Sequence, residues 1–573
     1  MSTRPSRGAA PAAATPAAEQ LDPRRWLALA VVLIAAFMQL MDISIVNVAI
    51  PSIQRDLDAS YSQVQWVLAG YQLAFAVVLI TGGRLGDIYG RKRLFLIGVT
   101  GFTIASALCG FAQNPGMLVG SRVLQGAMGA LMFPQVLSIT QVEFSPRERG
   151  TAFGITGAVI GLATISGPLL GGLLIAGNLL NLDWRPIFLV NLPLGVLAIV
   201  AAVVLLRESK AEGALRLDPV GVAIASVALL MLIYPLVEGR DLGWPAWTFL
   251  VMAASVPVFA LFALYERRKT RKDNSPLVVL GLFRERAFVS GLLVSMALFS
   301  GVASFFLTFS LFLQIGLGFT ALHSGLTTIP FSFGTAIGSA ASVRLAPRLG
   351  RLILSLGCLL LVAGMLGVMA TINRYGTAVH SWQLLPALLV CGLGLGCVIA
   401  PLLNLIVAGV SGRNAGSASG VLTTTQQFGG ALGVAIIGVI FFGLLSSQAN
   451  PTIAQVAPHI RVALQAASVP PPVAERVVAG FSTCFHDRAS AKDPSATPPS
   501  CRQAATQGQG QGGQAIGQVL QAAGVDARKR DFVSSIQRTL WFEVAVYALG
   551  FLLVFLLPNV RGQRLRQAGG GAA

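Results

Sequence analysis

The chain has 573 residues, of which 54% are hydrophobic and only 11% are charged, and its mean hydropathy is +0.72. Soluble domains carry about 25% charged residues, so the composition excludes an ordinary soluble protein and indicates an all-α integral membrane protein. The net charge of +18 would suit a nucleic-acid-binding protein, but the positions of the basic residues argue against that function.

Fourteen stretches are apolar and long enough to cross a bilayer, which takes about 20 residues. If the N-terminus is cytoplasmic, the segments on its side hold 27 Lys and Arg residues, whereas the six short loops on the other side hold four. This asymmetry follows the positive-inside rule, so the basicity sets orientation, predicts that both termini are cytoplasmic, and requires no nucleic-acid partner. The predicted spans are 26–50, 63–83, 94–112, 116–139, 151–177, 186–206, 218–237, 245–265, 287–315, 324–343, 352–371, 382–410, 417–446 and 539–558.

The first span contains a carboxylate, Asp42, within the run WLALAVVLIAAFMQLMDISIVNVAIP. An aspartate at the centre of a membrane helix costs about 2.5–3.5 kcal/mol on insertion scales. Such a residue is either a buried acid satisfied by hydrogen bonds or a proton or cation site. We expect a proton or cation site.

The second span ends in GGRLGDIYGRKR, residues 82–93. Its glycines allow a close helix approach and a tight turn, and its charged residues can form a contact with a neighbouring helix end. The alternative is a basic loop that only sets topology. We expect a gating loop made of Gly83, Arg84, Gly86, Asp87, Gly90 and Arg91.

The fourth span carries Arg122, the one Lys or Arg predicted deep inside a span, with Gln125 three residues later on the same face. An unpaired guanidinium there would be costly, so it should meet a carboxylate, a carbonyl dipole or water. Asp42 is the expected carboxylate. A purely structural buried cation is the alternative.

The fifth span contains SGPLLGGLL, residues 166–174. Its small residues form a face on which another helix can pack closely, and Pro168 removes a backbone hydrogen bond. Generic membrane-helix packing would explain this composition equally well. The residues of interest are Gly167, Pro168, Gly171 and Gly172; in the sixth span, within WRPIFLVNLPLG, Asn191 and Pro193 are expected to be structural.

Three sequence pairs recur in register about 260 residues apart: RLGDIYGR with RLAPRLGR, GAMGALMFP with LGLGCVIAP, and RERGTAFG with RNAGSASG. The chain is therefore predicted to contain two six-helix halves around a central path, a transporter layout. The first predicted segments are a disordered tail 1–25, an N-terminal half 26–207, and two inserted helices with an inner loop 208–272. The C-terminal half follows as helices 9–13 in 273–446, a long outer loop 447–538 and helix 14 in 539–559, and a cytoplasmic tail 560–573 ends the chain. Cys484 and Cys501 lie in the outer loop, on the oxidising side, where a disulfide is expected.

These motifs, in order and on the expected helices, resemble the major facilitator superfamily and, within it, the fourteen-helix drug:proton antiporters. The resemblance implies a monomeric exporter in the bacterial cytoplasmic membrane that exchanges an amphipathic small molecule for protons, with no cofactor or metal. It associates Arg122 with proton coupling, residues 82–93 with gating and residues 166–174 with antiport. Three positions depart from the family pattern: Ala163 replaces a glycine, Pro186 an aromatic residue, and Pro347 stands where the first copy has Asp87.

The substrate pocket is expected to be apolar, with aromatic side chains and few polar groups. Glu543 is expected at the membrane interface, which would leave Asp42 without a second acid in the core and make it serve both proton and substrate. The candidate pocket residues are Trp66, Tyr71, Gln72, Gln125, Phe305, Gln314, Gln426 and Gln427.

Several alternatives remain. A proton-coupled uptake symporter could use the same fold, and an exporter could be dedicated to self-resistance against one secondary metabolite. An enzyme would need clustered His, Asp, Glu or Ser residues, but the four histidines are all predicted at outer ends or in the outer loop. A receptor would need a signalling domain, and no predicted inner loop is long enough. We therefore expect a secondary transporter rather than an enzyme.

Overall fold

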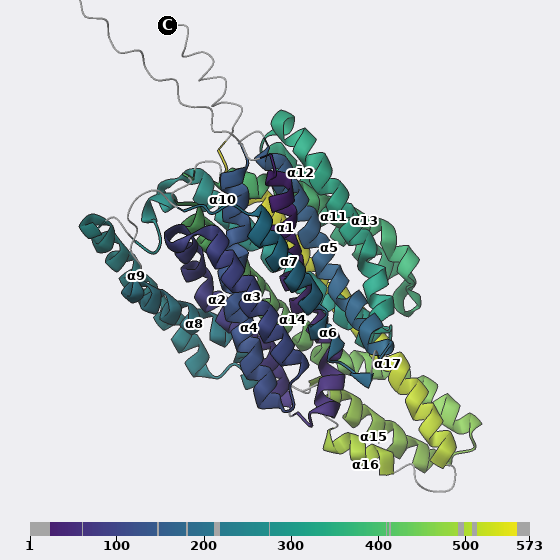
Figure 1. Cartoon of the computed structure of the whole chain (residues 1–573). Coiled ribbons are helices and arrows are strands. Elements are labelled where there is room, and N and C mark those ends of the chain that lie inside the picture. Colours follow the sequence, from purple (N-terminus) through teal and green to yellow (C-terminus); the bar gives the residue numbers. More distant parts are fainter. Residues whose placement is uncertain are drawn as a thin grey trace, which may run out of the picture.

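The computed structural model describes residues 23–59, 61–145, 148–178, 181–210, 218–273, 276–407, 410–411, 414–490, 498–506 and 513–558. These residues form helices joined by short connections, with no strand among them (Figure 1). The predicted tail 560–573 and almost all of the tail 1–25 lie outside the described residues, as does part of the loop that precedes the inserted helices.

The N-terminal half contains α1 (Arg25–Asp56), α2 (Tyr61–Tyr89), α3 (Arg91–Gly110), α4 (Pro115–Glu143), α5 (Arg149–Ala176), α6 (Pro186–Leu189) and α7 (Asn191–Leu205). The inserted helices are α8 (Pro219–Leu242) and α9 (Ala246–Asp273). The C-terminal half contains η2 (Leu280–Arg284), α10 (Arg286–Leu311), the π-helical η3 (Phe312–Gly316), α11 (Ala321–Leu349), α12 (Leu352–Tyr375), η4 (Gly376–Ala378), α13 (Ser381–Val407), α14 (Ala415–Ala466), α15 (Pro471–Ser490), α16 (Pro499–Thr506) and α17 (Gly513–Val554).

Within the described residues, twelve helical segments are long and apolar enough to cross a membrane, compared with the fourteen spans predicted. The two predicted spans that are not among the twelve correspond to α5, which is described only in part, and α11. Six buried serines and threonines of α11, among them Ser332 and Thr335, lower its apolar character. The sixth predicted span is divided into α6 and α7.

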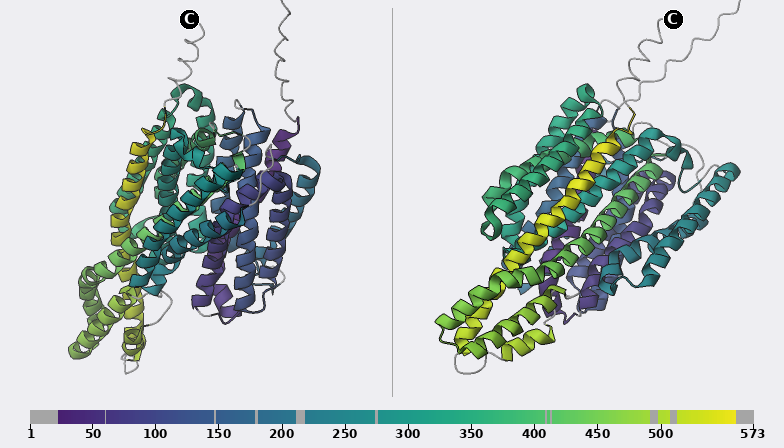
Figure 2. Two further views of the ribbon diagram at one scale, coloured as in Figure 1. Left: turned by 90° about the vertical axis from the view of Figure 1, so that its left-hand side faces the viewer. Right: turned by 180° about the vertical axis from the view of Figure 1, so that it is seen from behind.

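The two halves are separate bundles (Figure 2). The N-terminal half has an apolar core of its own, whereas the larger core of the C-terminal half also takes in residues of the N-terminal half such as Leu73, Leu137 and Phe153. In the N-terminal half α1 packs against α5 and α7, and in the C-terminal half α10 packs in the same way against α14 and α17. The halves meet where α5 contacts α11 and α13, and where α14 contacts α2 and α4. The inserted α8 and α9 lie at the edge of the molecule, and α9 exposes apolar side chains that suit a lipid surface (Figure 1).

Local sequence signals fix the ends of several helices. Asn114 accepts a hydrogen bond from the backbone N–H of Met117 at 2.9 Å, and Pro115 occupies the first helical position of α4. Both are favoured residue types for these positions. Between α2 and α3, Gly90 has a φ of +112°, which only glycine adopts readily, and this lets α3 begin directly after α2.

The described chain begins and ends at one end of the bundle, which we call the terminal face (Figure 1). There Arg25 at the start of α1 pairs with Glu148 at the start of α5 at 2.6 Å. At the same face the last described residues accept hydrogen bonds: Arg286 donates to the Leu556 carbonyl (3.1 Å) and Arg351 to the Leu557 carbonyl (3.1 Å).

Residues 447–538, predicted as an outer loop, are largely helical and form a small domain beyond the bundle that we call the cap (Figure 1). The α14 helix continues to Ala466, and α17 begins at Gly513 rather than near 539. Apolar positions on α14, α15 and α17 pack into a core of the cap's own, which explains why this stretch folds: Val456, Ile460, Leu464, Val477, Val478, Phe481, Ile516 and Ala527.

A disulfide joins Cys484 on α15 to Cys501 on α16, 17 residues apart. Closing a loop of this length stabilises a fold by about 3 kcal/mol in the chain-entropy description. Replacing both cysteines by serine should therefore lower amide-exchange protection in the cap, measured by hydrogen-exchange mass spectrometry, while α1–α5 exchange as before. Equal protection of the cap in both proteins would show that its apolar core is sufficient.

Candidate functional site

The centre of the N-terminal half contains a buried ion pair. Arg122 of α4 donates a hydrogen bond from Nη1 to Oδ2 of Asp42 on α1 at 2.5 Å, and both side chains are at most 1% exposed. The other carboxylate oxygen, Oδ1, accepts hydrogen bonds from Nε2 of Gln125 (3.0 Å) and Nδ2 of Asn191 (2.8 Å). The carboxylate of Asp42 therefore accepts hydrogen bonds from three donors on α4 and α7.

Arg122 is held from several sides. Its Nε donates to the Val67 carbonyl at 3.1 Å, and its Nη1 also donates to Oε1 of Gln125 at 2.7 Å. Its guanidinium carbon lies 4.3 Å from the centroid of the Tyr71 ring, a cation–π contact. Removing one member of a buried ion pair costs about 3–5 kcal/mol, because the remaining charge is left unpaired.

Asn191, the first residue of α7, was expected to be only structural, but it contacts the acid directly. The same Nδ2 donates to Ser106 of α3 at 3.0 Å, and the Ser106 hydroxyl donates to the Phe188 carbonyl at 2.9 Å. Sequence reasoning gave Asn191 only a structural role and did not identify Ser106. The signal for Asn191 was an amide inside an apolar span.

At the terminal face, the motif 82–93 contacts the other half of the protein. The carboxylate of Asp87 accepts hydrogen bonds from the backbone N–H groups of Gly416 (3.1 Å) and Ser417 (3.2 Å) at the start of α14. Arg91 donates to the same carboxylate at 2.7 Å. A carboxylate is stabilised at a helix N-terminus by unpaired N–H groups and by the helix dipole. Because Arg91 compensates the charge, Asp87 can stay buried here.

The glycines of this motif allow the approach. A Cβ at Gly83 would overlap the carbonyl oxygen of Gly416, and one at Gly416 would overlap the carbonyl oxygen of Gly83. Within the N-terminal half, Gly86 packs directly on the side chain of Gln135 of α4. The neighbouring Arg84 is 1% exposed. Further along the junction, the hydroxyls of Ser138 and Ser419 lie 2.8 Å apart. The two halves are therefore in close contact at the terminal face.

The fifth-helix motif lies at two interfaces. Gly167 is buried against Ser44 of α1, and a Cβ at Gly172 would lie 3.6 Å from that of Leu322 in α11 of the other half. Gly171 is buried, whereas the side chain of Pro168 lies outside the described residues. Small residues here let α5 approach both α1 and α11.

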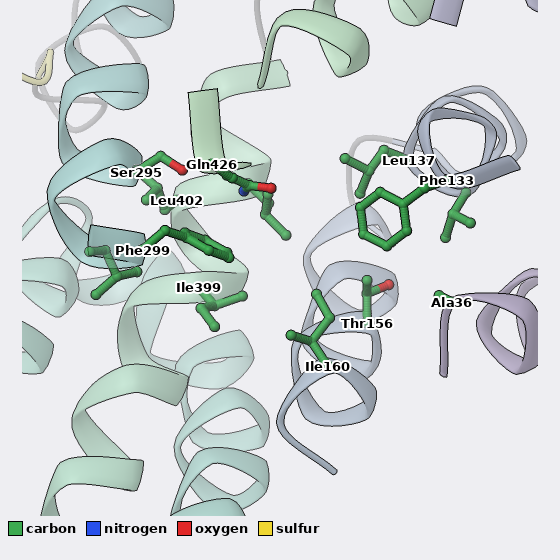
Figure 3. A pocket seen from close by; sticks show the side chains of 13 residues that line it. Ala36, Phe133, Leu137, Thr156, Ile160, Ser295, Phe299, Ile399, Leu402 and Gln426 are labelled. Carbon is green, nitrogen blue, oxygen red and sulfur yellow. The ribbon is translucent and has the colours of Figure 1, made fainter. Parts of the chain in front are cut away.

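An apolar cavity lies between the halves and contains about 470 Å³ of empty space, its opening included (Figure 3). Phe133 and Ile160 approach it from α4 and α5, and Phe299 and Ile399 from α10 and α13 (Figure 3). The polar side chains that line it are Thr156, Ser295 and Gln426, and no charged residue lines it. The full lining is Ala36, Phe133, Val136, Leu137, Thr156, Ile160, Ser295, Leu298, Phe299, Ile399, Leu402, Leu403 and Gln426.

Of the eight predicted pocket residues, Gln426 lines this cavity. Tyr71 and Gln125 belong to the ion-pair site, and Trp66 contacts Tyr234 of the inserted α8, with ring centroids 6.3 Å apart. The other four lie elsewhere: Phe305 is buried among phenylalanines of the C-terminal half, Gln314 donates to Ser310 at 2.9 Å, Gln72 is exposed and Gln427 is half-buried.

The expectation that Glu543 is interfacial is wrong. Its side chain is 0% exposed, within α17. The reason for the error is that α17 begins 26 residues before the predicted span, so Glu543 is not near a helix end but is covered by neighbouring helices of the C-terminal half. Asp42 is therefore not the sole buried acid in the bundle.

The sequence matches the family model described as the Major Facilitator Superfamily over residues 32–434. It is 42% identical over 536 residues to the "Probable actinorhodin transporter" of Streptomyces coelicolor, covering 93% of this chain and 92% of that protein. It is 37% identical to the "Tetracenomycin C resistance and export protein" of Streptomyces glaucescens (74% and 77% covered), and 30% identical to the "Multidrug efflux pump LfrA" of Mycolicibacterium smegmatis (76% and 84% covered).

Among solved structures, the human organic anion transporter MFSD10 superposes with a TM-score of 0.55 at 15% identity, covering 93% of this chain and all of the other. At this identity the likeness concerns the fold. The family match, which spans most of the chain, and the two-bundle architecture agree, and the protein belongs to the Major Facilitator Superfamily of transporters.

Proposed function

We propose that the protein exports an amphipathic drug or antibiotic across the bacterial cytoplasmic membrane in exchange for protons. The observation that carries the proposal is the buried pair of Asp42 and Arg122 in the N-terminal half. The helix that carries Asp42, α1, also lines an apolar cavity. Ala36 of α1 lines that cavity, and Asp42 follows it by six residues, about 9 Å along the helix. Relatives named as an actinorhodin transporter, a resistance and export protein and a multidrug efflux pump support this function.

Proton binding at Asp42 would change the forces within this site. The ionised carboxylate holds Arg122, Gln125 and Asn191 together, and these donors come from two other helices. A neutral carboxyl gives up the charge that compensates Arg122. The proton therefore alters the packing of α1 against α4 and α7, which connects the protonation state to the conformation of this half.

The same proposal places the terminal face in the cytoplasm, in accordance with the distribution of basic residues. The Asp87 contact with α14 then closes the cavity on the cytoplasmic side, and the described conformation opens outward or is occluded. Export requires this contact to break so that substrate can enter from the cytoplasm.

Inverted membrane vesicles provide the test. A panel of neutral, zwitterionic and monovalent cationic dyes, ethidium among them, should accumulate when an inside-acid pH gradient is imposed and should stop accumulating when a protonophore dissipates it. A pH jump of the opposite sign should reverse the flux. Substrate that moves in the same direction as the protons would identify an uptake symporter instead.

A dedicated self-resistance exporter is the second candidate. It is favoured by the 42% identity over 93% of the chain to a protein named for one natural product. The breadth of the dye panel separates the two: a multidrug exporter moves chemically unrelated dyes, whereas a dedicated exporter moves none of them but moves one class of natural product.

The Asp87 contact makes a separate prediction. Replacing Asp87 by Asn removes the charge that Arg91 and the α14 N-terminus stabilise, so the terminal face should open more often. The rate at which a maleimide labels Ser138→Cys, buried at the junction, should rise. Glu148→Gln is the matched control, because it breaks an ion pair at the same face that does not join the two halves. An unchanged labelling rate in Asp87→Asn would remove the gating role.

A further inference from the structure

The C-terminal half contains its own buried carboxyl, which the mechanism above does not use. Glu543 is 0% exposed, and neither of its carboxylate oxygens has a hydrogen-bond partner. The adjacent hydroxyl, Ser304 of α10, is directed to the Ser300 carbonyl at 2.7 Å. Among the described residues no Lys, Arg or His pairs with it. Asp42, by contrast, has three donors.

The surroundings of Glu543 are uncharged. One turn later Tyr547 is 1% exposed and its hydroxyl has no partner. Its ring packs on Gly301 of α10, where a Cβ would lie 2.6 Å from it. The other titratable groups near this part of α17 are the thiols of Cys358 on α12 and Cys391 on α13. An ionised carboxylate here would have no compensating charge, so Glu543 is neutral in this conformation.

The neighbour of Glu543 on α10, Ser304, lies at nearly the same depth as Asp42. Asp42 lies 17 residues after Arg25, the start of α1, and Ser304 lies 18 residues after Arg286, the start of α10. Both are about 26 Å from the terminal face. The α10–α17 pair of the C-terminal half corresponds to the α1–α7 pair of the N-terminal half, and each pair holds one acid. In the N-terminal half the acid, Asp42, is on the first helix of the pair, α1, whereas in the C-terminal half the acid, Glu543, is on the second, α17.

A line of buried polar residues leads along α17 from the cap to this acid. The residues are spaced four apart, so that each lies about one turn from the next, and none is more than 2% exposed: Asp531, Ser535, Thr539, Glu543 and Tyr547. Asp531 and Ser535 each have an oxygen without a hydrogen-bond partner. Glu543 follows Asp531 by 12 residues, so the line is about 18 Å long. An apolar core alone would not require these groups.

We propose that Glu543 is a second proton-binding carboxyl, reached from the cap side along the polar line of α17. A proton from water on that side binds the carboxylate and gives the neutral acid, and the same proton leaves to water on the terminal face when the C-terminal half rearranges. With Asp42 as the first site, two protons enter per transport cycle. The stoichiometry rests on the proposed function, whereas the proton site itself does not.

Infrared spectroscopy of the full chain in lipid nanodiscs tests the site without any substrate. The C=O stretching band of a protonated carboxyl should be present at neutral pH, lost in Glu543→Gln, and retained in Asp42→Asn. Glu543→Asp should keep the band at a shifted position and serves where the Gln variant does not fold. A band that is identical in wild type and in a folded Glu543 variant would overturn the proposal.

The path has its own readout. In D2O the Glu543 band shifts as its proton is exchanged, and Thr539→Val should slow this shift because it removes one hydroxyl of the line. Thr371→Val is the control, since it makes the same chemical change on α12, at a hydroxyl that bonds the Gly367 carbonyl and is not part of the line on α17. Equal exchange in wild type, Thr539→Val and Thr371→Val would show that protons reach Glu543 by another route.

Proteoliposomes loaded with ethidium measure the stoichiometry. The proton gradient needed to balance an ethidium gradient should correspond to one proton fewer in Glu543→Gln than in wild type. An unchanged ratio would contradict a coupled second site. If wild type moves no ethidium, that result counts against the proposed multidrug function, and the infrared bands still decide whether Glu543 binds the proton.

Discussion

Asp42→Asn is expected to abolish transport driven by a pH gradient while leaving the protein in the membrane. Asparagine has nearly the same volume as aspartate and can keep a hydrogen bond with Asn191, but it cannot exchange a proton. Accumulation of a transported dye in inverted vesicles measures the loss, and exchange of external for internal dye without a gradient is the internal control. Normal gradient-driven transport by this variant would exclude Asp42 as a coupling site.

The same substitution should also lower stability, because it leaves the Arg122 guanidinium buried without its counter-charge. The expected loss is about 3–5 kcal/mol. In Asp42→Asn combined with Arg122→Gln, both charges are absent, so most of that stability should return while transport stays absent. Thermal unfolding in detergent separates the two effects. If the double variant is as unstable as the single one, the destabilisation has another cause than the unpaired charge.

Gly83→Ala is expected to open the terminal face. The added methyl group would overlap the backbone carbonyl of Gly416, and backbone on a packed helix cannot move aside as a flexible side chain does. Overpacking of this kind costs about 1–3 kcal/mol, which corresponds to roughly 5- to 150-fold in the ratio of closed to open states. Transport should fall because the terminal face no longer closes fully during the transport cycle.

Spin labels at Arg93 on α3 and Leu352 on α12, both exposed near the terminal face, report the distance between the halves. Their distance distribution should shift to longer values in Gly83→Ala. Gly150→Ala, near the same face on α5, makes the same chemical change where nothing lies within 4 Å, so its distribution should match wild type. A wild-type distribution in Gly83→Ala would show that the helices can separate slightly without opening.

The membrane-embedded part of the protein could be predicted well from sequence because bilayer thickness, the cost of buried charge and the internal repeat each restrict the answer. A guanidinium and a carboxylate within apolar spans indicate a pair, and the structure joins Arg122 to Asp42. The repeat predicted two halves, which the fold contains. Asn191 was assigned only a structural role because a neutral amide carries no comparable cost and its partner Asp42 lies 149 residues away.

The region between 447 and 538 could not be predicted in the same way. Its apolar positions are spaced for helices, but they bury one another only after α14, α15 and α17 come together, and Pro, Gln and Gly residues between them obscure the pattern. The misplaced start of α17 then led to the error at Glu543, since the depth of a residue in a span depends on where the helix begins. The cavity was likewise beyond sequence, because its lining comes from six helices.

The α17 helix runs for 42 residues without an internal proline, about 63 Å, from the cap to the terminal face. It packs on α10, α12 and α14, so it is part of the C-terminal half along its course. A helix of this kind acts as a stiff rod: when the C-terminal half tilts during transport, the cap must swing with it. If the terminal face is cytoplasmic, as proposed above, the cap lies outside the cell, and a binding protein that clamps the cap to the N-terminal half would arrest transport from that side.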